Sequence, residues 1–315
     1  MLKGRDLLTL KDFTSSEIRK VLDVSATLKA EAKEEKFRKL LANKSMAMLF
    51  QKPSTRTRVS FDVAMSQLGG HAIDLPMAVI QVGRGETMED TGRTLSRYVD
   101  VIMARLYNHE DLVKLADGAT VPVINGLTDR YHPCQILGDL LTLREKKGKL
   151  KGVKLAYVGD GNNVANSLLI GSSKCGVDVS VATPKGYEPL EEAIEEAKLA
   201  SKETGCKVEI TNDIEHAVAD ADAVYTDVWV SMGMEEEQEQ RMKVFKPYQV
   251  DTHLMKKAKP DAAFMHCLPM HRGLEVSAEV ADGPHSIILD QAENRLHAQK
   301  GLLVLLLTDG KNLLP

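Results

Sequence analysis

A predicted strand meets a predicted helix in the stretch Gln51-Lys52-Pro53-Ser54-Thr55-Arg56-Thr57-Arg58-Val59-Ser60-Phe61. Residues 46–50 before it are apolar and predict a short buried strand. After it, apolar residues recur at helical spacing as far as Gly69-Gly70, and Ser54 is a residue type that caps helix N-termini. The junction therefore places a cluster of cations at the start of a helix.

Three positive charges, on Lys52, Arg56 and Arg58, lie at the positive end of the predicted helix dipole. Each such placement costs a few tenths to about 1 kcal/mol unless an anion neutralises the charge. Free backbone amides at the helix start, the hydroxyl side chains of the stretch and forked guanidinium groups together suit a phosphate or a carboxylate. The sequence therefore predicts an anion site, although arginines that only solvate a helix end would show the same spacing.

Length, net charge and cysteine content limit the classes of protein to which the chain can belong. A chain of 315 residues is long enough for two domains, and a net charge of −4 with 27% charged residues indicates neither nucleic acid nor an anionic membrane as partner. The four cysteines, at positions 134, 175, 206 and 267, form no CxxC pair, so neither a zinc site nor a disulfide framework is expected. Residues 1–20 lack the apolar region of a signal peptide, and the longest apolar run, 302–307, is too short to span a bilayer. We expect a cytoplasmic protein.

Strands alternate with helices along both halves of the chain, which is typical of parallel sheets with helices on both faces. We therefore expect an α/β fold of two doubly wound domains, each with a mostly parallel sheet flanked by helices. Thr14-Ser15-Ser16-Glu17 is a capping box that begins a first helix, and the charged segment 31–39 is expected to continue this helix. Residues 81–87 are expected to form a Gly-rich loop, and the acidic run 235–240 a solvated helix face. The predicted strands are 46–50, 72–75, 99–104, 121–124, 154–158, 177–182, 207–210, 223–226, 262–265 and 287–289.

The pair Gly159-x-Gly161 follows a predicted strand, as the first glycines of a dinucleotide-binding loop do. The third glycine of the GxGxxG pattern is replaced by Val164, and the next strand ends at Thr183-Pro184 without an acidic residue to hold a ribose. NAD binding is therefore not expected.

Candidate chemistry lies where predicted strands end. Arg105, Asn163, Asp227 and Cys267 all follow carboxyl ends of strands, the edge at which open α/β sheets bind ligands. Three of the candidate residues could instead have purely structural roles: Arg105 in a surface ion pair, Cys267 as a small buried apolar residue, and His132 as a loop-capping group. The nine histidines include no HExxH motif or close His/Cys grouping, so no metal is expected.

The chain carries four motifs that stand out, namely Ser54-Thr55-Arg56-Thr57-Arg58, His132-Pro133-Cys134-Gln135, Asp227-Val228-Trp229-Val230-Ser231-Met232-Gly233 and His266-Cys267-Leu268-Pro269. They resemble the motifs of the ornithine carbamoyltransferase family, in the family's order and spacing, and the likeness covers essentially the whole chain. The first two are shared with carbamoyltransferases in general, including the aspartate enzymes, whereas the last two are typical of the ornithine type.

This resemblance implies a carbamoyl phosphate-binding domain at 1–149, an ornithine-binding domain at 150–290 and a C-terminal helix at 291–315 that packs back on the first domain. Arg105 and His132 would donate to the carbamoyl oxygen, and Arg295 would add a donor near the phosphate. The phosphate would be held by Ser54, Thr55, Arg56 and Thr57. The carbamoyl NH₂ would be accepted by Gln135 and by the carbonyl groups of Cys267 and Leu268.

The resemblance further implies that ornithine is bound by Asn163, Asp227, Ser231 and Met232, with Cys267 beside its reactive amine. Gln81 would be contributed to the site of a neighbouring subunit in a homotrimer or a multiple of trimers. No cofactor and no metal are implied. The reaction would belong to arginine metabolism, in a direction that the sequence leaves open.

Two alternatives remain at this stage. One is carbamoyl transfer to putrescine or to another amine or amino acid, although an aspartate site would need cations for two carboxylates where this chain offers Asp227. The other is a carbamoyl phosphate or ornithine binding protein without catalysis. Citrulline formation from the two substrates separates these alternatives from the ornithine enzyme.

Overall fold

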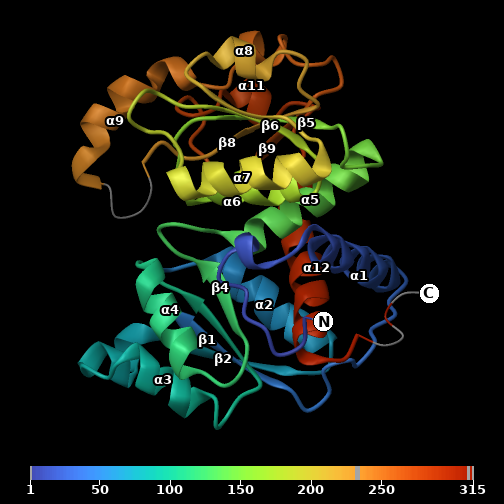
Figure 1. The fold of residues 1–315 in the computed structure, drawn as a ribbon, viewed down its shortest axis with the longest axis vertical. Helices are drawn as coiled ribbons and strands as arrows, with labels where there is room; N and C mark the ends of the chain where they lie inside the picture. Colours follow the sequence, from blue (N-terminus) through green and yellow to red (C-terminus); the bar gives the residue numbers. More distant parts are fainter. Residues whose placement is uncertain (1, 231–234, 311–312, 314–315) are drawn as a thin grey trace. The chain divides into compact units, whose positions relative to one another are not determined.

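The computed structural model describes residues 2–230, 235–310 and 313 (Figure 1). The chain forms two compact units, one of Met1–Leu141 with Glu293–Pro315 and one of Thr142–Ala292. The divisions fall inside α5 (Pro133–Lys147) and α12 (Ile288–Leu307), whereas the sequence placed boundaries after residues 149 and 290. A long helix therefore carries the chain from one unit to the other each time.

The first unit is built on a four-stranded sheet in the order β2-β1-β3-β4, with every pairing parallel. Figure 1 shows α3 and α4 on one side of this sheet and α1 with α12 on the other. The predicted capping box at Thr14 and Glu17 is present at the start of α1. The elements, besides α5 and α12, are α1 (Ser15–Lys33), β1 (Ser45–Phe50), α2 (Thr55–Gln67), β2 (His71–Pro76), α3 (Met88–Leu95), β3 (Val101–Arg105), α4 (His109–Gly118) and β4 (Val123–Leu127).

The second unit is built on a five-stranded, wholly parallel sheet in the order β7-β6-β5-β8-β9. Helices α6 and α7 cover one face, and α8 and α11 the other (Figure 1). Its elements are β5 (Lys154–Val158), α6 (Asn163–Lys174), β6 (Asp178–Ala182), α7 (Glu191–Thr204), β7 (Val208–Thr211), α8 (Ile214–Val218), β8 (Ala223–Thr226), α9 (Gln238–Phe245), α10 (Thr252–Met255), β9 (Ala263–His266) and α11 (Ala278–Ala281). Short 3-10 helices lie at Leu10–Asp12, Met77–Val79, Gln81–Arg84, Glu235–Glu237 and Lys246–Tyr248.

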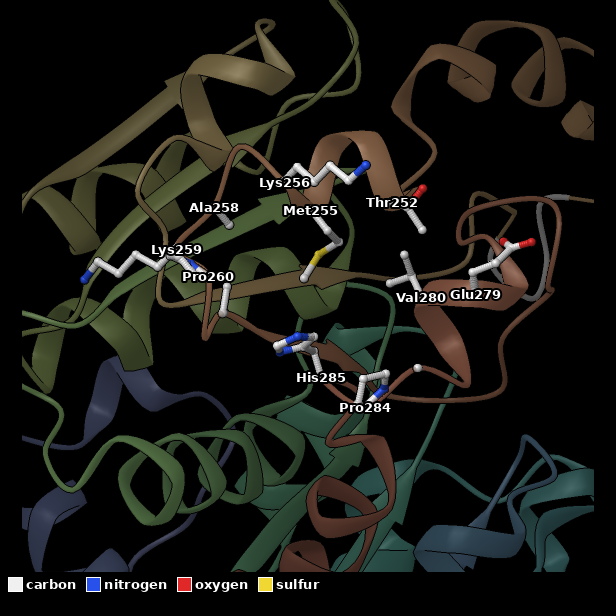
Figure 2. A pocket seen from close by; sticks show the side chains of 12 residues that line it. Thr252, Met255, Lys256, Ala258, Lys259, Pro260, Glu279, Val280, Pro284 and His285 are labelled. Carbon is white, nitrogen blue, oxygen red and sulfur yellow. The ribbon is translucent and has the colours of Figure 1, made fainter.

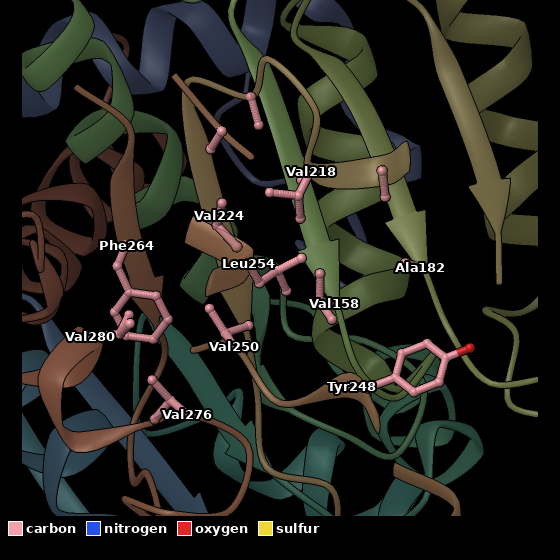
Figure 3. Close-up of a cluster of buried hydrophobic side chains, with 14 of the residues drawn as sticks. Val158, Ala182, Val218, Val224, Tyr248, Val250, Leu254, Phe264, Val276 and Val280 are labelled. Carbon is pink, nitrogen blue, oxygen red and sulfur yellow. The ribbon is translucent and has the colours of Figure 1, made fainter. Parts of the chain in front are cut away.

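Apolar side chains between the second sheet and its covering helices form a continuous core (Figure 3). Val158, Val224 and Phe264 project from three strands and meet Leu254 of α10 and Val280 of α11. These strands read as nearly unbroken apolar runs because both faces of a parallel sheet are buried. The core fixes the strands whose carboxyl ends carry the candidate residues.

Each sheet has a point where neighbouring strands send the chain in opposite directions. In the first sheet β1 leads to β2 on one side, whereas β3 leads to β4 on the other. In the second, β5 leads toward β6, whereas β8 leads to β9. Right-handed crossovers then place the outgoing helices on opposite faces and leave a crevice at the carboxyl ends of the two strands. Both crevices carry residues that the sequence singled out.

Several local predictions were wrong. The apolar run 287–289 is not a strand: α12 begins at Ile288, and the edge of the sheet gains only an isolated bridge between Phe264 and Ser286. A short apolar run cannot be told from the first buried turn of a helix by its periodicity. Helix α1 ends at Lys33 rather than continuing through the charged segment, and Glu35 has a left-handed backbone with φ of 57°.

The Gly-rich segment 81–87 starts as a 3-10 helix, and α4 was not anticipated. Among the described residues, no helix combines the length and apolar composition needed to cross a bilayer.

Candidate active site

The predicted anion loop begins α2 as expected. The Ser54 hydroxyl caps the helix by accepting from the Thr57 backbone N–H at 3.1 Å. The Thr57 hydroxyl is buried and accepts from Nη2 of Arg295, on α12, at 2.8 Å. Residues 238 positions apart in the chain are thus joined at the start of α2, and a buried guanidinium is added to the cationic loop.

The three cations of the loop differ in their surroundings. Arg58 lies 3.0 Å from the Asp74 carboxylate, and its guanidinium stacks over the Phe50 ring at 4.9 Å. The interpretation of Arg58 as an anion-facing charge is therefore wrong, because a partner from β2 neutralises it. Lys52 is buried with its ammonium 4.4 Å from the Tyr107 ring centroid. Arg56 is half-buried on the first turn of α2, and among the described residues no carboxylate forms an ion pair with it.

His132 lies buried at the start of α5, where its carbonyl accepts from the backbone N–H groups of Gln135 and Ile136. Burial, followed by the charges of Arg295, Arg105 and Arg56, lowers the pKa of His132 well below its usual value. The imidazole is therefore neutral at physiological pH and can donate one N–H hydrogen bond. Guanidinium charges from three elements, α12, β3 and α2, thus act on this ring.

Gln135 offers an acceptor in the same region. Its Nε2 donates to Oδ1 of Asp139, one turn along α5, at 2.8 Å, which assigns the amide orientation because a carboxylate can only accept. Its Oε1 is buried and has no hydrogen-bond partner in the part of the chain that the structure describes. An unsatisfied buried acceptor costs about 1–3 kcal/mol, a cost that the N–H group of a ligand would remove.

The remaining candidates of the first unit are spread more widely. Arg105 is the last residue of β3 and is buried, so the alternative of a surface ion pair is wrong. Thr55 is exposed at the first position of α2. Gln81 is exposed, and within the described part of the chain its side chain makes no hydrogen bond. Burial raises the pKa of Cys134 to about 12, so this thiol is no nucleophile.

In the second unit, Asp227 directly follows β8 and is buried. Its Oδ2 accepts from Nδ2 of Asn162 at 2.8 Å, and its Oδ1 accepts from the Cys267 thiol at 3.0 Å. The predicted residues Asp227 and Cys267 are thus brought together from the ends of β8 and β9. Asn163 is the first residue of α6 and half-buried. Ser231 and Met232 lie outside the described residues.

Asn162 was missed by the sequence analysis, which chose its neighbour. Its Oδ1 accepts from the backbone N–H groups of Val164 and Ala165 at 2.9 and 3.2 Å, and so caps α6. Because this capping fixes the amide orientation, Nδ2 must point toward the Asp227 carboxylate. The Asn-Asn pair after a strand was the available signal, but sequence alone does not tell the two apart.

The segment after β9 is held in an unusual conformation. Leu268 has a left-handed backbone with φ of 60°, and its N–H donates to Nδ1 of His266 at 2.9 Å. Nε2 of His266 lies 3.3 Å from the buried Glu275 carboxylate. Burial alone would raise the pKa of Glu275, but hydrogen bonds from His266 and from backbone N–H groups outweigh it and lower the pKa. Strained non-glycine residues cluster at functional sites, which fits this position.

Asp227, His266 and Cys267 together place three possible metal-ligand atoms within 4.8 Å of one another. No such grouping is visible in the sequence, because these residues come from the ends of two different strands. Zn²⁺ binds carboxylate oxygen, imidazole nitrogen and thiolate sulfur. In this structure the Cys267 thiol donates a hydrogen bond to Asp227, and Nδ1 of His266 accepts one from the Leu268 N–H, so all three side chains already belong to a protein hydrogen-bond network.

A pocket of about 450 Å³ lies elsewhere in the second unit (Figure 2). Met255 of α10, Val280 of α11 and Ala262 line it, and Lys259 at its rim is paired with Asp222 at 2.7 Å. Ala262 precedes β9, so the pocket lies at the amino end of this strand, whereas Asp227 and Cys267 follow strand ends. It therefore contains none of the predicted site residues.

Comparison with known proteins accounts for both crevices. Residues 5–145 match the description "Aspartate/ornithine carbamoyltransferase, carbamoyl-P binding domain", and residues 151–306 match "Aspartate/ornithine carbamoyltransferase, Asp/Orn binding domain". The chain belongs to the aspartate/ornithine carbamoyltransferase family. The resemblance inferred from four motifs is therefore confirmed, and so is the α/β fold with two parallel sheets.

Within the aspartate/ornithine carbamoyltransferase family, similar proteins are named ornithine carbamoyltransferase. One from Pyrococcus abyssi is 58% identical over 306 residues, 97% of this chain and 96% of that protein. One from Bacillus subtilis is 54% identical over 311 residues, 99% of this chain and 96% of that protein. The solved ornithine carbamoyltransferase of Pyrococcus furiosus is 57% identical, with a TM-score of 0.94 over 97% of this chain and 98% of that one.

Proposed function

We propose that this chain is an ornithine carbamoyltransferase, which transfers the carbamoyl group of carbamoyl phosphate to the δ-amine of L-ornithine and releases L-citrulline and phosphate. The observation that carries the proposal is the neutral, buried His132 close to the guanidinium groups of Arg56, Arg105 and Arg295. Such a site suits a substrate that carries a phosphate dianion and a carbonyl oxygen on which negative charge develops.

Carbamoyl phosphate is bound, in this proposal, by the loop at the start of α2 and by residues around His132. Arg105 and the N–H group of His132 donate to the carbamoyl oxygen as it becomes an oxyanion, an interaction worth about 3–4 kcal/mol per donor in other acyl-transfer sites. The phosphate contacts come from Ser54, Thr55, Arg56, Thr57 and Arg295. The acceptors for the carbamoyl NH₂ are Oε1 of Gln135 and the carbonyl oxygens of Cys267 and Leu268.

The amino-acid substrate is bound by residues of the second unit. The Asp227 carboxylate pairs with the α-ammonium of ornithine, and Cys267 lies beside the reacting amine. The other contacts come from Asn163, Ser231 and Met232. An amine of this kind resembles that of lysine, with a pKa of about 10.4 in water, so desolvation must favour its neutral form before attack.

The chemistry then needs no covalent intermediate with the protein. The lone pair of the δ-amine nitrogen attacks the carbamoyl carbon and forms a tetrahedral oxyanion. The bond from carbon to the phosphate oxygen breaks, phosphate leaves with the electron pair, and the nitrogen gives up one proton to the departing phosphate or to solvent. Fixed cations at the phosphate and donors at the oxyanion stabilise the charges that move.

The domain roles follow the same proposal: residues 1–149 bind carbamoyl phosphate, 150–290 bind ornithine, and 291–315 return to the first domain. We propose a homotrimer, or a multiple of trimers, in which Gln81 serves a neighbouring subunit. The exposure of Gln81 beside Val79, which is 71% exposed, supports an interface there. A cytoplasmic location is supported by the four cysteines, none of which forms a disulfide.

A panel of ornithine, putrescine, lysine and aspartate, each with carbamoyl phosphate, tests the proposal by phosphate release and detection of the carbamoylated product. Citrulline formed at the highest kcat/KM is the expected result. Faster turnover of putrescine would assign the chain to another amine, and binding of both substrates without product would indicate a binding protein.

A further inference from the structure

A buried guanidinium holds together the two segments that carry the proposed ornithine contacts. Arg241 lies on α9, which is otherwise mostly exposed, yet Arg241 itself is only 3% exposed. Its Nε donates to the carbonyl oxygen of Trp229 at 2.7 Å, and its Nη2 makes a close ion pair with the Asp160 carboxylate. Its Nη1 is 3.3 Å from Glu237, one turn earlier on the helix.

The two residues that Arg241 holds stand just behind the site. Asp160 belongs to the turn after β5 and lies two positions before Asn162. Trp229 lies in the segment after β8, two positions after Asp227. The Asn162 amide and the Asp227 carboxylate are themselves hydrogen-bonded. The guanidinium therefore links the same pair of segments a second time, from the side of α9.

The surroundings leave this guanidinium little freedom. Its central carbon lies 5.0 Å from the Tyr187 ring centroid and 5.2 Å from that of Phe245, which in turn stacks with Trp229. The Tyr157 hydroxyl donates to the Asp160 carbonyl at 2.8 Å and so fixes the turn itself. A planar fork enclosed by aromatic rings can keep two acceptors at a set separation, which a flexible ammonium cannot.

Stability alone is a poor reason for such an arrangement. Apolar residues of similar volume often replace a buried ion pair without loss of stability, because desolvation of both charges offsets their attraction. The ion pair of Arg241 with Asp160 instead fixes the relative positions of the segments that follow β5 and β8. Burial raises the pKa of Asp160 to about 7, the charge of Arg241 opposes this rise, and the charges of Asp227 and Glu237 add to it.

We propose that Arg241 is a positioning residue for the amino-acid substrate. By holding Asp160 and the Trp229 carbonyl together, it keeps Asn162 against Asp227 and keeps that carboxylate directed toward the α-ammonium. The inference rests on the proposed function, since it assigns the α-ammonium to Asp227. It adds a residue that touches neither substrate.

The test compares Arg241→Met, Arg241→Lys and Asp160→Asn with wild type, and uses Arg272→Met as matched control. Arg272 also pairs with an aspartate of the second unit, Asp282, but both side chains are about half exposed. Arg241→Met should raise the KM for ornithine about tenfold or more, with the KM for carbamoyl phosphate changed less than about twofold. The KM for ornithine of Arg241→Lys should lie between those of wild type and Arg241→Met, because an ammonium restores the ion pair but not the fork. The Arg272→Met control should keep the KM values of wild type.

A second measurement removes the reacting amine. L-norvaline has the α groups of ornithine and no δ-amine, so its affinity, measured by calorimetry on the enzyme saturated with carbamoyl phosphate, reports recognition of the α groups alone. The loss of norvaline affinity in each variant should parallel the rise in the KM for ornithine. In a double-mutant cycle, Asp160→Asn should add little to Arg241→Met, since both break one link.

Unchanged norvaline affinity in Arg241→Met, or an equal loss for both substrates alongside a lowered Tm, would overturn the inference in favour of a purely structural role. If Arg241→Met does not fold, Arg241→Lys and Asp160→Asn decide the question by the same ratios. Citrulline formation by wild type tests the proposed function separately: a wild type that binds ornithine but forms no citrulline overturns that function and leaves the affinity ratios as the test of Arg241.

Discussion

Asn162 donates from Nδ2 to Oδ2 of Asp227 at 2.8 Å, and this bond ties the turn after β5 to the segment after β8. The other carboxylate oxygen of Asp227, Oδ1, meanwhile accepts a hydrogen bond from the Cys267 thiol. The carboxylate is thus oriented from two sides at the crevice where the chain leaves β5 and β8 in opposite directions. Its direction is set before any substrate arrives.

Asp227→Asn should lower kcat/KM for ornithine by at least about tenfold, because a charge-assisted hydrogen bond to the α-ammonium is worth about 1.5–3 kcal/mol. The KM for carbamoyl phosphate should barely change. Putrescine, which lacks the α groups, should lose much less than ornithine. Asp213→Asn, which alters an exposed aspartate that caps α8, serves as control. Equal losses for ornithine and putrescine would show that Asp227 acts on the reacting amine instead.

Arg56→Gln should raise the KM for carbamoyl phosphate and lower kcat, since charge moves onto the leaving phosphate that the fork contacts. The matched control is Arg58→Gln, two positions away, whose charge is already paired with Asp74. We expect the control to keep the KM of wild type within about threefold. Steady-state constants of Arg56→Gln that equal those of wild type would remove Arg56 from the site.

The comparison of these two arginines shows what sequence could predict. The motif identified the anion loop, its capping serine and the strand before it, because all three are local. It could not separate Arg56 from Arg58, since the partner of Arg58 is Asp74 on β2, brought alongside only by strand pairing. The position of Arg295 against Thr57 is likewise a product of tertiary structure.

The same limit explains what was missed in the second unit. Asn162 and Asn163 are equivalent in sequence, and only the helix cap shows which amide faces Asp227. Arg241 follows a run of acidic and amide residues that predicts a solvated helix face, and it is buried because Asp160 and Trp229 meet it from elsewhere in the chain. The alternation of strands and helices needs no such long-range information, so the fold class could be predicted.

Subunit exchange tests whether Gln81 completes a neighbouring site. Gln81→Ala and Arg105→Ala chains, each of low activity alone, should regain activity when dissociated, mixed and reassembled, because some mixed trimers then hold a site with both residues intact. Light scattering and differently tagged chains would show that exchange has taken place. Mixtures that exchange subunits and remain as inactive as their parents would count against a shared site.

The stability of the first unit should depend on pH through His297. Burial, followed by the charges of Lys300 and Lys29, lowers the pKa of His297 to about 4, although Glu293 opposes this at 3.2 Å. Between this value and the ordinary 6.5 the unfolded chain binds one more proton than the folded one. Stability therefore falls as pH falls through this window, by up to about 1.4 kcal/mol per pH unit.

His297→Gln removes the titrating group and keeps a neutral side chain that can still donate to Glu293. Its free energy of unfolding, measured in urea at pH 7.0 and 5.0 and at one fixed protein concentration, should fall less than that of wild type over this interval. The difference should be on the order of 2 kcal/mol.

The control is His285→Gln, at an exposed position, which should keep the wild-type dependence of stability on pH. The buried His132, whose pKa is also lowered, contributes a residual slope to all three proteins, so only the change on substitution is diagnostic. Parallel slopes for wild type and His297→Gln would mean that His297 is protonated in the folded chain over this range, and that its contact with Glu293 is an ion pair.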